Sequence, residues 1–125
     1  STGSYASKSV SVASQDTAPV DLTLSVDGTK LYVAGGATRT IYQYTLSTPF
    51  DVSTGTYSNK SFSVASQESS LFTMFFSYNG LTLYVTGDGN DTVYQYALST
   101  AWDVSTASYS SISLGIGGTV LNQVP

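Results

Sequence analysis

The side chains that most often carry chemistry in proteins are scarce in this sequence. Its 125 residues include no histidine and no cysteine. The commonest general base, the imidazole ligands of metal sites and the thiol nucleophile are therefore missing. Any acid–base chemistry would have to come from the eight carboxylate side chains. We therefore expect a protein that is not an enzyme, with no catalytic residues, no metal ligands and no cofactor.

Structural roles explain the carboxylates that recur in the sequence. Asp51 and Asp103 lie at matching positions in the strings FDVST and WDVST. Neighbouring aspartate and hydroxyl oxygens bind nearby backbone N–H groups and fix turns, so both aspartates are predicted to form turns. Asp16 and Glu68 also match each other. Both follow a predicted strand directly, and we expect them to be solvated.

The densest acidic segment is Gly87–Asp91 (GDGND), which faintly resembles a calcium-binding loop. Calcium takes about six to eight oxygen ligands, and the EF-hand supplies them at a fixed spacing that ends in a bidentate glutamate. This segment has neither that spacing nor that glutamate. The matching segment, Gly35–Arg39, has no carboxylate. A turn is therefore predicted here rather than a metal site.

Two asparagines are candidate glycosylation sites. Asn59 and Asn90 begin the sequons NKS and NDT, and both are expected to lie beside turns. Chance matches to this pattern are frequent in a sequence with 22 serines and 17 threonines. The alternative is therefore that both asparagines are unmodified.

Aromatic side chains suggest a second kind of surface contact, because their rings stack on sugars. Tyr78 and Trp102 are the candidate ligand contacts, although Trp102 also serves to anchor a long connection to its sheet. Packing between sheets better explains the tyrosines that recur at a two-residue spacing. These are Tyr42, Tyr44, Tyr94 and Tyr96.

The charge balance excludes one class of partner and favours one location. Four basic and eight acidic residues give a net charge of −4, and no basic cluster exists that would attract nucleic acid. No apolar run approaches the roughly 20 residues that a membrane helix requires, so membrane insertion is not expected. Low charge with abundant Ser, Thr, Gly, Tyr and Asn is typical of secreted or surface proteins. We therefore expect an extracellular or surface location.

The sequence repeats with a period of 52 residues. Ser1–Val52 superposes on Ser53–Val104 without a gap, and 26 of the 52 positions are identical. A third copy begins at Ser105 and fades beyond Gly115. Repeats of this size stack their units to build a continuous core. We expect one domain over residues 1–125, with unit one at about 19–66, unit two at about 71–116 and a tail at 117–125.

Each unit is predicted to form four short antiparallel strands. The first strand alternates apolar and polar residues, and Asp27-Gly28 or Asn79-Gly80 then provides a hairpin turn to the second. The third strand contains the recurring tyrosines, and a longer connection leads to the fourth. If this pattern is correct, seven apolar side chains should be largely buried: Leu22, Leu24, Leu31, Val33, Met74, Leu83 and Val85.

The fourth strand of the unit occurs three times, whereas the other three occur twice. The surplus copy is predicted at residues 8–14, before unit one. It has no partner strands of its own in the sequence, so it is a candidate donor to the sheet of another chain. Its residues are Lys8, Ser9, Val10, Ser11, Val12, Ala13 and Ser14.

Two strings give the chain a family resemblance. Ser25–Val33 (SVDGTKLYV) and Tyr94–Tyr109 (YQYALSTAWDVSTASY) together resemble the β-propeller repeats common in bacteriophage and aquatic bacterial surface proteins. The resemblance covers roughly residues 1–114. It implies a scaffold of four-stranded blades that presents loops, in extracellular or virion proteins, and it implies no single reaction.

Two blades are too few to close a propeller of about four to eight. Two, three or four copies would give a ring, and a contact that does not close would give a filament. The chain can also be the ordered part of a larger propeller protein. We expect a structural or adhesive subunit of an extracellular homo-oligomer, such as a fibre, a surface layer or a virion appendage. The alternative is a carbohydrate-binding module, formed by oligomerised two-blade chains, whose partners are glycans.

Overall fold

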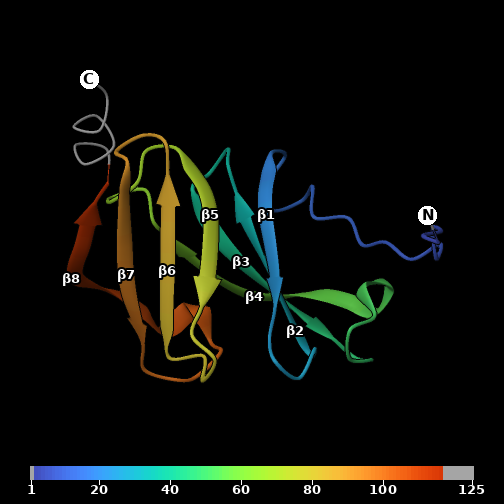
Figure 1. Ribbon diagram of the computed structural model, residues 1–125. Coiled ribbons are helices and arrows are strands. Elements are labelled where there is room, and N and C mark those ends of the chain that lie inside the picture. Colours follow the sequence, from blue (N-terminus) through green and yellow to red (C-terminus); the bar gives the residue numbers. More distant parts are fainter. Residues whose placement is uncertain (1, 117–125) are drawn as a thin grey trace.

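The computed structural model describes residues 2–116 and contains two four-stranded antiparallel sheets (Figure 1). The first sheet runs in the order β1 (Pro19–Leu24), β2 (Lys30–Gly35), β3 (Thr40–Leu46) and β4 (Gly55–Ser63). The second repeats that order as β5 (Leu71–Phe76), β6 (Thr82–Gly87), β7 (Thr92–Leu98) and β8 (Ala107–Gly115). The prediction of four strands per unit is confirmed. The tail predicted at 117–125 lies outside the described residues.

Matching turns connect the strands of the two units. Gly28 and Gly80 have φ values of +74° and +73°, as the predicted hairpins require. The third strand leads to a short 3₁₀ turn, η1 (Val52–Thr54) in the first unit and η2 (Val104–Thr106) in the second. The carboxylates of Asp51 and Asp103 accept the N–H groups of Ser53 and Ser105 and cap these turns. Both aspartates are therefore the turn formers that the sequence predicts.

The outermost strand of each sheet is divided by a residue with positive φ. Asn59 in β4 has a φ of 57° and Ser111 in β8 has a φ of 58°, and the strand pairing shifts register there. Two residues of each outer strand, 58–59 in β4 and 110–111 in β8, are left without a partner at this bulge, which bends the strand. Each outer strand therefore consists of two short paired halves.

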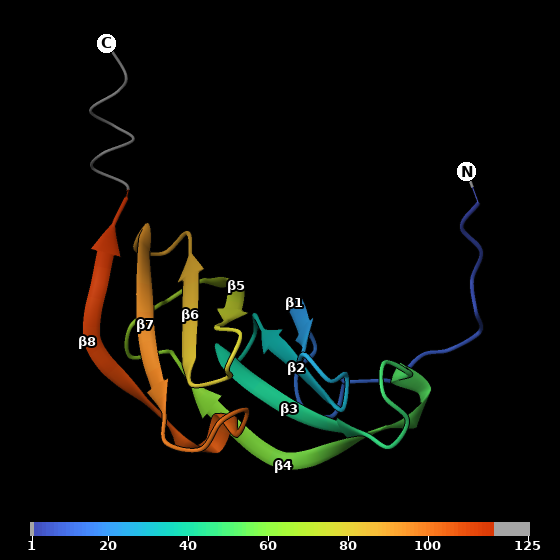
Figure 2. The same ribbon diagram turned by 60° about the horizontal axis from the view of Figure 1, so that its bottom comes forward.

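The two sheets pack against each other with β1 beside β5 (Figures 1 and 2). The Tyr32 hydroxyl donates to the Trp102 carbonyl at 2.5 Å, and the Gln43 side-chain oxygen accepts from the Val104 N–H at 2.9 Å. The Asp21 carboxylate of β1 also accepts the Met74 N–H at 2.9 Å and the Thr73 hydroxyl at 2.8 Å, so polar contacts join the sheets at β1 and β5 as well. An apolar core lies between the sheets. Its buried members are Tyr32, Ala34, Ile41, Val64, Leu71, Met74, Phe76, Leu83, Val85, Tyr96, Leu98 and Val104.

Burial confirms most of the predicted core, but the prediction for Leu22 is wrong. Leu31, Val33, Met74, Leu83 and Val85 are buried and Leu24 is half-buried. Leu22 is 63% exposed, whereas its counterpart Met74 is 5% exposed. Met74 is covered because the first sheet packs over it, and nothing in the described chain packs over Leu22 in the same way. The units are therefore alike in sequence but not in environment.

No helix within residues 2–116 combines the length and the apolar character needed to cross a lipid bilayer.

Candidate functional site

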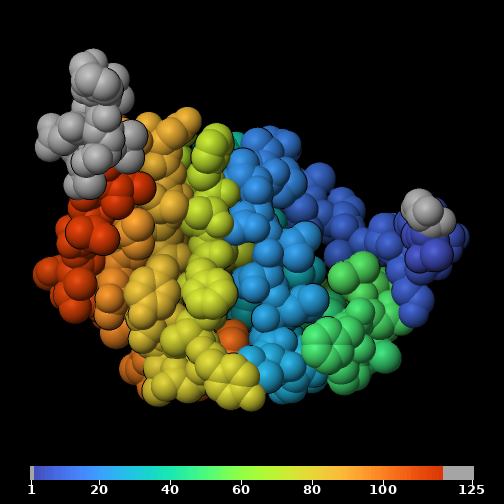
Figure 3. Space-filling view, in the orientation of Figure 1, coloured from blue at the N-terminus to red at the C-terminus, as the bar shows by residue number. Residues whose placement is uncertain are grey.

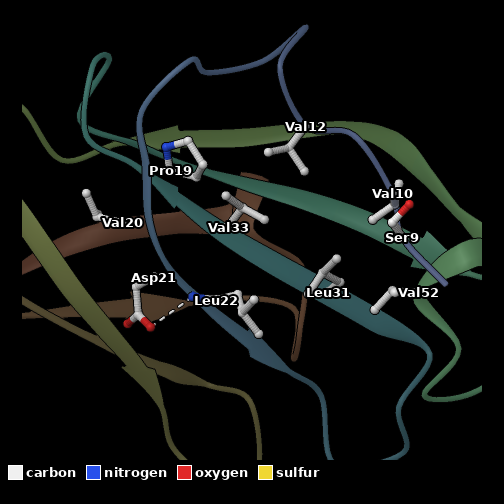
Figure 4. Close-up of a pocket in the computed structure, with 10 residues that line it drawn as sticks. All are labelled: Ser9, Val10, Val12, Pro19, Val20, Asp21, Leu22, Leu31, Val33 and Val52. Atoms are coloured by element: carbon white, nitrogen blue, oxygen red, sulfur yellow. Dashed lines mark hydrogen bonds between the residues drawn. The ribbon is translucent and has the colours of Figure 1, made fainter. Parts of the chain in front are cut away.

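The first sheet carries an open apolar hollow, the first-sheet groove (Figure 4). Its volume is about 600 Å³. Side chains from β1, β2, the 3₁₀ turn η1 and the segment before β1 form its walls. The lining residues are Ser9, Val10, Val12, Pro19, Val20, Asp21, Leu22, Leu31, Val33 and Val52.

The counterpart of this groove on the second sheet is filled by the chain itself. Leu71, Met74 and Val104 correspond to Pro19, Leu22 and Val52, and all three are buried in the core between the sheets. The side chains that cover them come from β2 and β3, chiefly Tyr32 and Gln43. The first-sheet groove is therefore the same kind of surface, but no sheet covers it within the described chain.

The second sheet carries the complementary open surface, the second-sheet outer face. It contains a smaller hollow of about 240 Å³. Tyr84, Val93 and Gln95 line it and correspond to Tyr32, Ile41 and Gln43, which fill the interface inside the chain. Ile112 and Leu114 of β8 flank these residues and are 52% and 65% exposed. One chain thus presents both halves of its internal interface, on opposite sheets.

The predicted strand at residues 8–14 is not formed. Residues 8–12 belong to no sheet and residues 13–15 form a turn, in which the Gln15 and Asp16 N–H groups donate to the Val12 carbonyl. The physical reason is that the matching segment in β4 pairs with β3, and the described chain has no corresponding strand for this segment. Its backbone donors and acceptors are left without a ladder.

The same segment is nevertheless fixed against the first sheet as β4 is fixed against the second. The Lys8 ammonium lies 2.7 Å from the Asp51 carboxylate, and the equivalent pair, Lys60 and Asp103, lies at 2.8 Å. The Tyr44 hydroxyl donates to the Gln15 side chain at 2.9 Å. Val10 and Val12 pack on the cluster around Tyr44. The segment also has the same kink as β4, because Ser7 has a φ of 61° and the equivalent residue Asn59 has a φ of 57°. The segment is therefore held in the shape of a strand that lacks its neighbour.

Tyr5 is more exposed than the equivalent tyrosines of the two sheets. Its counterparts Tyr57 and Tyr109 are half-buried, and each packs on two tyrosines of the adjacent strand. Tyr5 is 75% exposed. Within the described chain, no strand with a pair of tyrosines covers Tyr5 as β3 covers Tyr57 and β7 covers Tyr109.

The expectation that Asp16 and Glu68 are solvated is wrong, because both carboxylates are buried. The Asp16 carboxylate accepts the N–H groups of Ala18 and Thr38 at 2.7 and 2.9 Å and the Thr38 hydroxyl at 2.6 Å. Burial acts to raise the pKa of Asp16, but these hydrogen bonds outweigh it and hold the pKa below its usual value of 3.8. Each carboxylate ties the start of the first strand to the loop that follows the second.

Stability is expected to fall as the pH drops from about 4 toward 2. A hydrogen bond from the Thr29 N–H, with others from the Thr29 and Ser25 hydroxyls, lowers the pKa of Asp27 to about 2, and the pKa of Asp16 is also lowered. A carboxyl whose pKa is lower in the folded state stabilises the fold above its unfolded pKa and loses that contribution as it is protonated. Urea midpoints measured between pH 6 and 2 test this. The Asp16→Asn variant should show a shallower decline, and a flat profile in the parent would contradict the assignment.

The acidic segment Gly87–Asp91 forms the turn between β6 and β7, as predicted. The Glu68 carboxylate accepts the Gly89 N–H at 2.9 Å and the Ser70 N–H at 3.0 Å through one oxygen. Its other oxygen is buried without a hydrogen-bond partner. Within residues 2–116, no three acidic side chains gather as a metal site would require.

A chelator is therefore expected to leave the melting temperature and the assembly of the protein unchanged. The reason is that backbone N–H groups, rather than a cation, bind the carboxylate at this turn. Melting curves with and without EDTA provide the measurement. A clear loss of melting temperature in EDTA that calcium restores would contradict the expectation and would assign ligand roles to Asp88, Asn90 and Asp91.

The two sequon asparagines lie in different settings. Asn90 is exposed in the turn before β7, but its side-chain nitrogen donates to the Gln67 carbonyl and to the Tyr94 hydroxyl. Asn59 is also exposed, and it lies at the kink within β4 rather than beside a turn. A glycan on Asn90 would replace one of the two hydrogens on this nitrogen, so at least one of the two hydrogen bonds would be lost. Modification of either residue stays a prediction.

The two candidate ligand contacts also differ in their surroundings. Tyr78 is 83% exposed in the turn after β5. Trp102 is half-buried, and its ring packs against both Tyr32 and Phe76, which also contact each other. Figure 3 shows the face on which β1 and β5 lie side by side. Two other aromatic side chains of β5 are exposed, Phe72 at 56% and Phe75 at 66%.

The sequence contained a signal for the two open faces, although reasoning from the sequence named only the donor segment. Tyr32 and Gln43 recur as Tyr84 and Gln95. The first pair fills the interface inside the chain, so the second pair indicates a similar surface on the second sheet that nothing in the described chain covers.

Comparison with known proteins adds no family to this description. No protein-family model, no curated protein and no solved structure matches the chain.

Proposed function

We propose that this protein is a non-catalytic structural or adhesive subunit that assembles with copies of itself. The two sheets act as propeller-type blades, and the product is an extracellular fibre, a surface assembly or a virion appendage. The observation that carries the proposal is that one chain exposes both halves of its own internal interface, the first-sheet groove and the second-sheet outer face.

Physical chemistry supports association of these surfaces. The groove exposes apolar side chains, among them Leu22 at 63% and Val20 at 41%, and Val93 on the outer face is only half-buried. Contiguous exposed apolar patches mark interaction sites, and burying them is favourable by roughly 25 cal/mol per Å². Because the two surfaces differ, contact between them is heterologous. Such contacts build rings when the rotation closes and filaments when it does not.

The segment Lys8–Ser14 supports the same function by strand donation. Lys8 and Val10 fix it against the first sheet, and its residues 8–12 have no ladder partner within the described chain. Pairing with a strand of another copy would satisfy its backbone groups and would give main-chain affinity. The donor and the groove beside it belong to one surface.

Sedimentation velocity of the full chain at micromolar concentration tests the proposal, together with electron microscopy of the same sample. The expected result is a multimer that appears as rings or filaments. A compact monomer at these concentrations would contradict it. The chain would then be better explained as part of a larger propeller protein.

A carbohydrate-binding module is the second candidate, and the exposed aromatic side chains favour it. Phe75 and Tyr78 are 66% and 83% exposed at β5 and the turn after it. Rings of this kind supply flat apolar surfaces on which sugars stack. A glycan array with the parent and the Tyr78→Ala variant separates the two candidates, because a structural subunit should show no binding that depends on Tyr78.

A further inference from the structure

The geometry points to one specific contact between copies, in which the second-sheet outer face of one chain enters the first-sheet groove of the next. The inference rests on the proposed function, because it names the surfaces through which the subunits assemble. The occupant of the groove is therefore a second copy of this chain, placed as the first sheet is placed on the second within one molecule.

The internal interface provides the template for this contact. Tyr32 and Gln43 are cross-strand neighbours on β2 and β3, and they are 0% and 1% exposed where they meet the second sheet. Tyr84 and Gln95 are the same pair on β6 and β7, and both remain half-buried at the second-sheet outer face. The identical residues are thus presented in the identical register.

The receiving surface also repeats. Inside the chain, Tyr32 donates to the Trp102 carbonyl and Gln43 accepts from the Val104 N–H. Phe50 and Val52 are the counterparts on the first sheet, and Val52 lines the groove. In the assembly, the Tyr84 hydroxyl donates to the Phe50 carbonyl, and the Gln95 side-chain oxygen accepts from the Val52 N–H. Polar groups that would otherwise be buried without partners are satisfied.

The donor segment completes the contact. Val10 and Val12 of the receiving chain already occupy the places that Phe62 and Val64 occupy inside the molecule. Leu114 and Ile116 of the incoming chain correspond to the same two positions, so the two segments exclude each other. The receiving chain's segment pairs with the incoming β7 in place of the last residues of β8. The groove, the outer face and the donated strand therefore act as one interface.

Two single substitutions test the contact by complementation. Leu22→Lys places a charge in the groove, and Gln95→Lys places one on the outer face. Their counterparts Met74 and Gln43 are 5% and 1% exposed inside the chain, so either charge would be buried in the assembly. Each variant alone should lose at least about 100-fold in self-association and sediment as a monomer. An equimolar mixture retains one intact pair of faces, so it should form a heterodimer and nothing larger.

The matched control is Ala97→Lys, on the same strand and two residues beyond Gln95. Its counterpart Thr45 is exposed even inside the chain, so this variant should assemble as the parent does. Circular dichroism verifies that each variant is folded, and Tyr84→Arg is a second outer-face variant should Gln95→Lys fail to fold. If the folded groove and outer-face variants still assemble, or if their mixture stays monomeric, this contact is overturned while self-assembly stands. A monomeric parent overturns the proposed function itself.

Discussion

Deletion of Ser1–Ser14 is expected to abolish assembly and to leave most of the β-sheet signal in place. The deleted residues include the donor segment Lys8–Ser14, which contributes no ladder strand to either sheet of its own chain. They also include Val10 and Val12, which form one wall of the groove. Sedimentation velocity measures the loss of assembly, and far-ultraviolet circular dichroism measures the retained sheet.

A pair of substitutions on β8 is the matched control for this deletion. Ile112→Ser and Leu114→Ser change exposed side chains at the positions that correspond to Lys8 and Val10. They weaken the strand that the donated segment replaces, so assembly should be kept or strengthened. A deletion variant that still forms rings or filaments would show that strand donation is not required.

Replacement of Tyr32 by alanine is expected to lower the free energy of unfolding by about 3–5 kcal/mol. The side chain is fully buried, packs on Phe76 and Trp102, and donates a hydrogen bond across the sheets. The variant therefore loses apolar contacts and leaves the Trp102 carbonyl without its donor. Urea unfolding in the Leu22→Lys background, where self-association is blocked, gives the measurement.

Tyr84→Ala is the matched variant in the second unit. Its side chain is half-buried at the second-sheet outer face, so the same change should lower the free energy of unfolding by about 1 kcal/mol or less. In the otherwise unchanged chain, it should weaken assembly strongly. Equal losses of stability at Tyr32 and Tyr84 would contradict the different roles assigned to the two faces.

The strands and turns could be predicted from the sequence because their signals are local. The hairpin glycines, the capping aspartates Asp51 and Asp103, and the alternation along each strand depend on residues close together in the chain. Each of these signals occurs twice, 52 residues apart, so the strands and turns predicted in one unit are supported by those predicted in the other. Closure of the sheets into a propeller remains part of the proposal.

The predictions that failed depend on the neighbours of a residue in space, and these neighbours differ between the two units although the sequences repeat. The sequence predicts Leu22 in the core because it matches Met74, but burial of that position depends on a neighbouring sheet. It predicts a strand for the donor segment, which matches β4, but a strand requires a partner. It predicts solvated side chains for Asp16 and Glu68 because charged residues are usually exposed, but their backbone hydrogen bonds involve loops about 20 residues away.

The kink at Ser111 divides β8 into two halves that pair separately with β7. The half beyond the kink pairs only Ile112–Gly115 with β7, and its apolar side chains are largely exposed. In terms of native-state hydrogen exchange, we expect this half to be a local opening unit of low free energy, separate from the rest of the sheet. In the proposed assembly, an incoming strand would then replace it residue by residue while the sheet stays folded. The rate of that assembly would be set by encounters between copies, and not by the slow global unfolding that strand exchange otherwise requires.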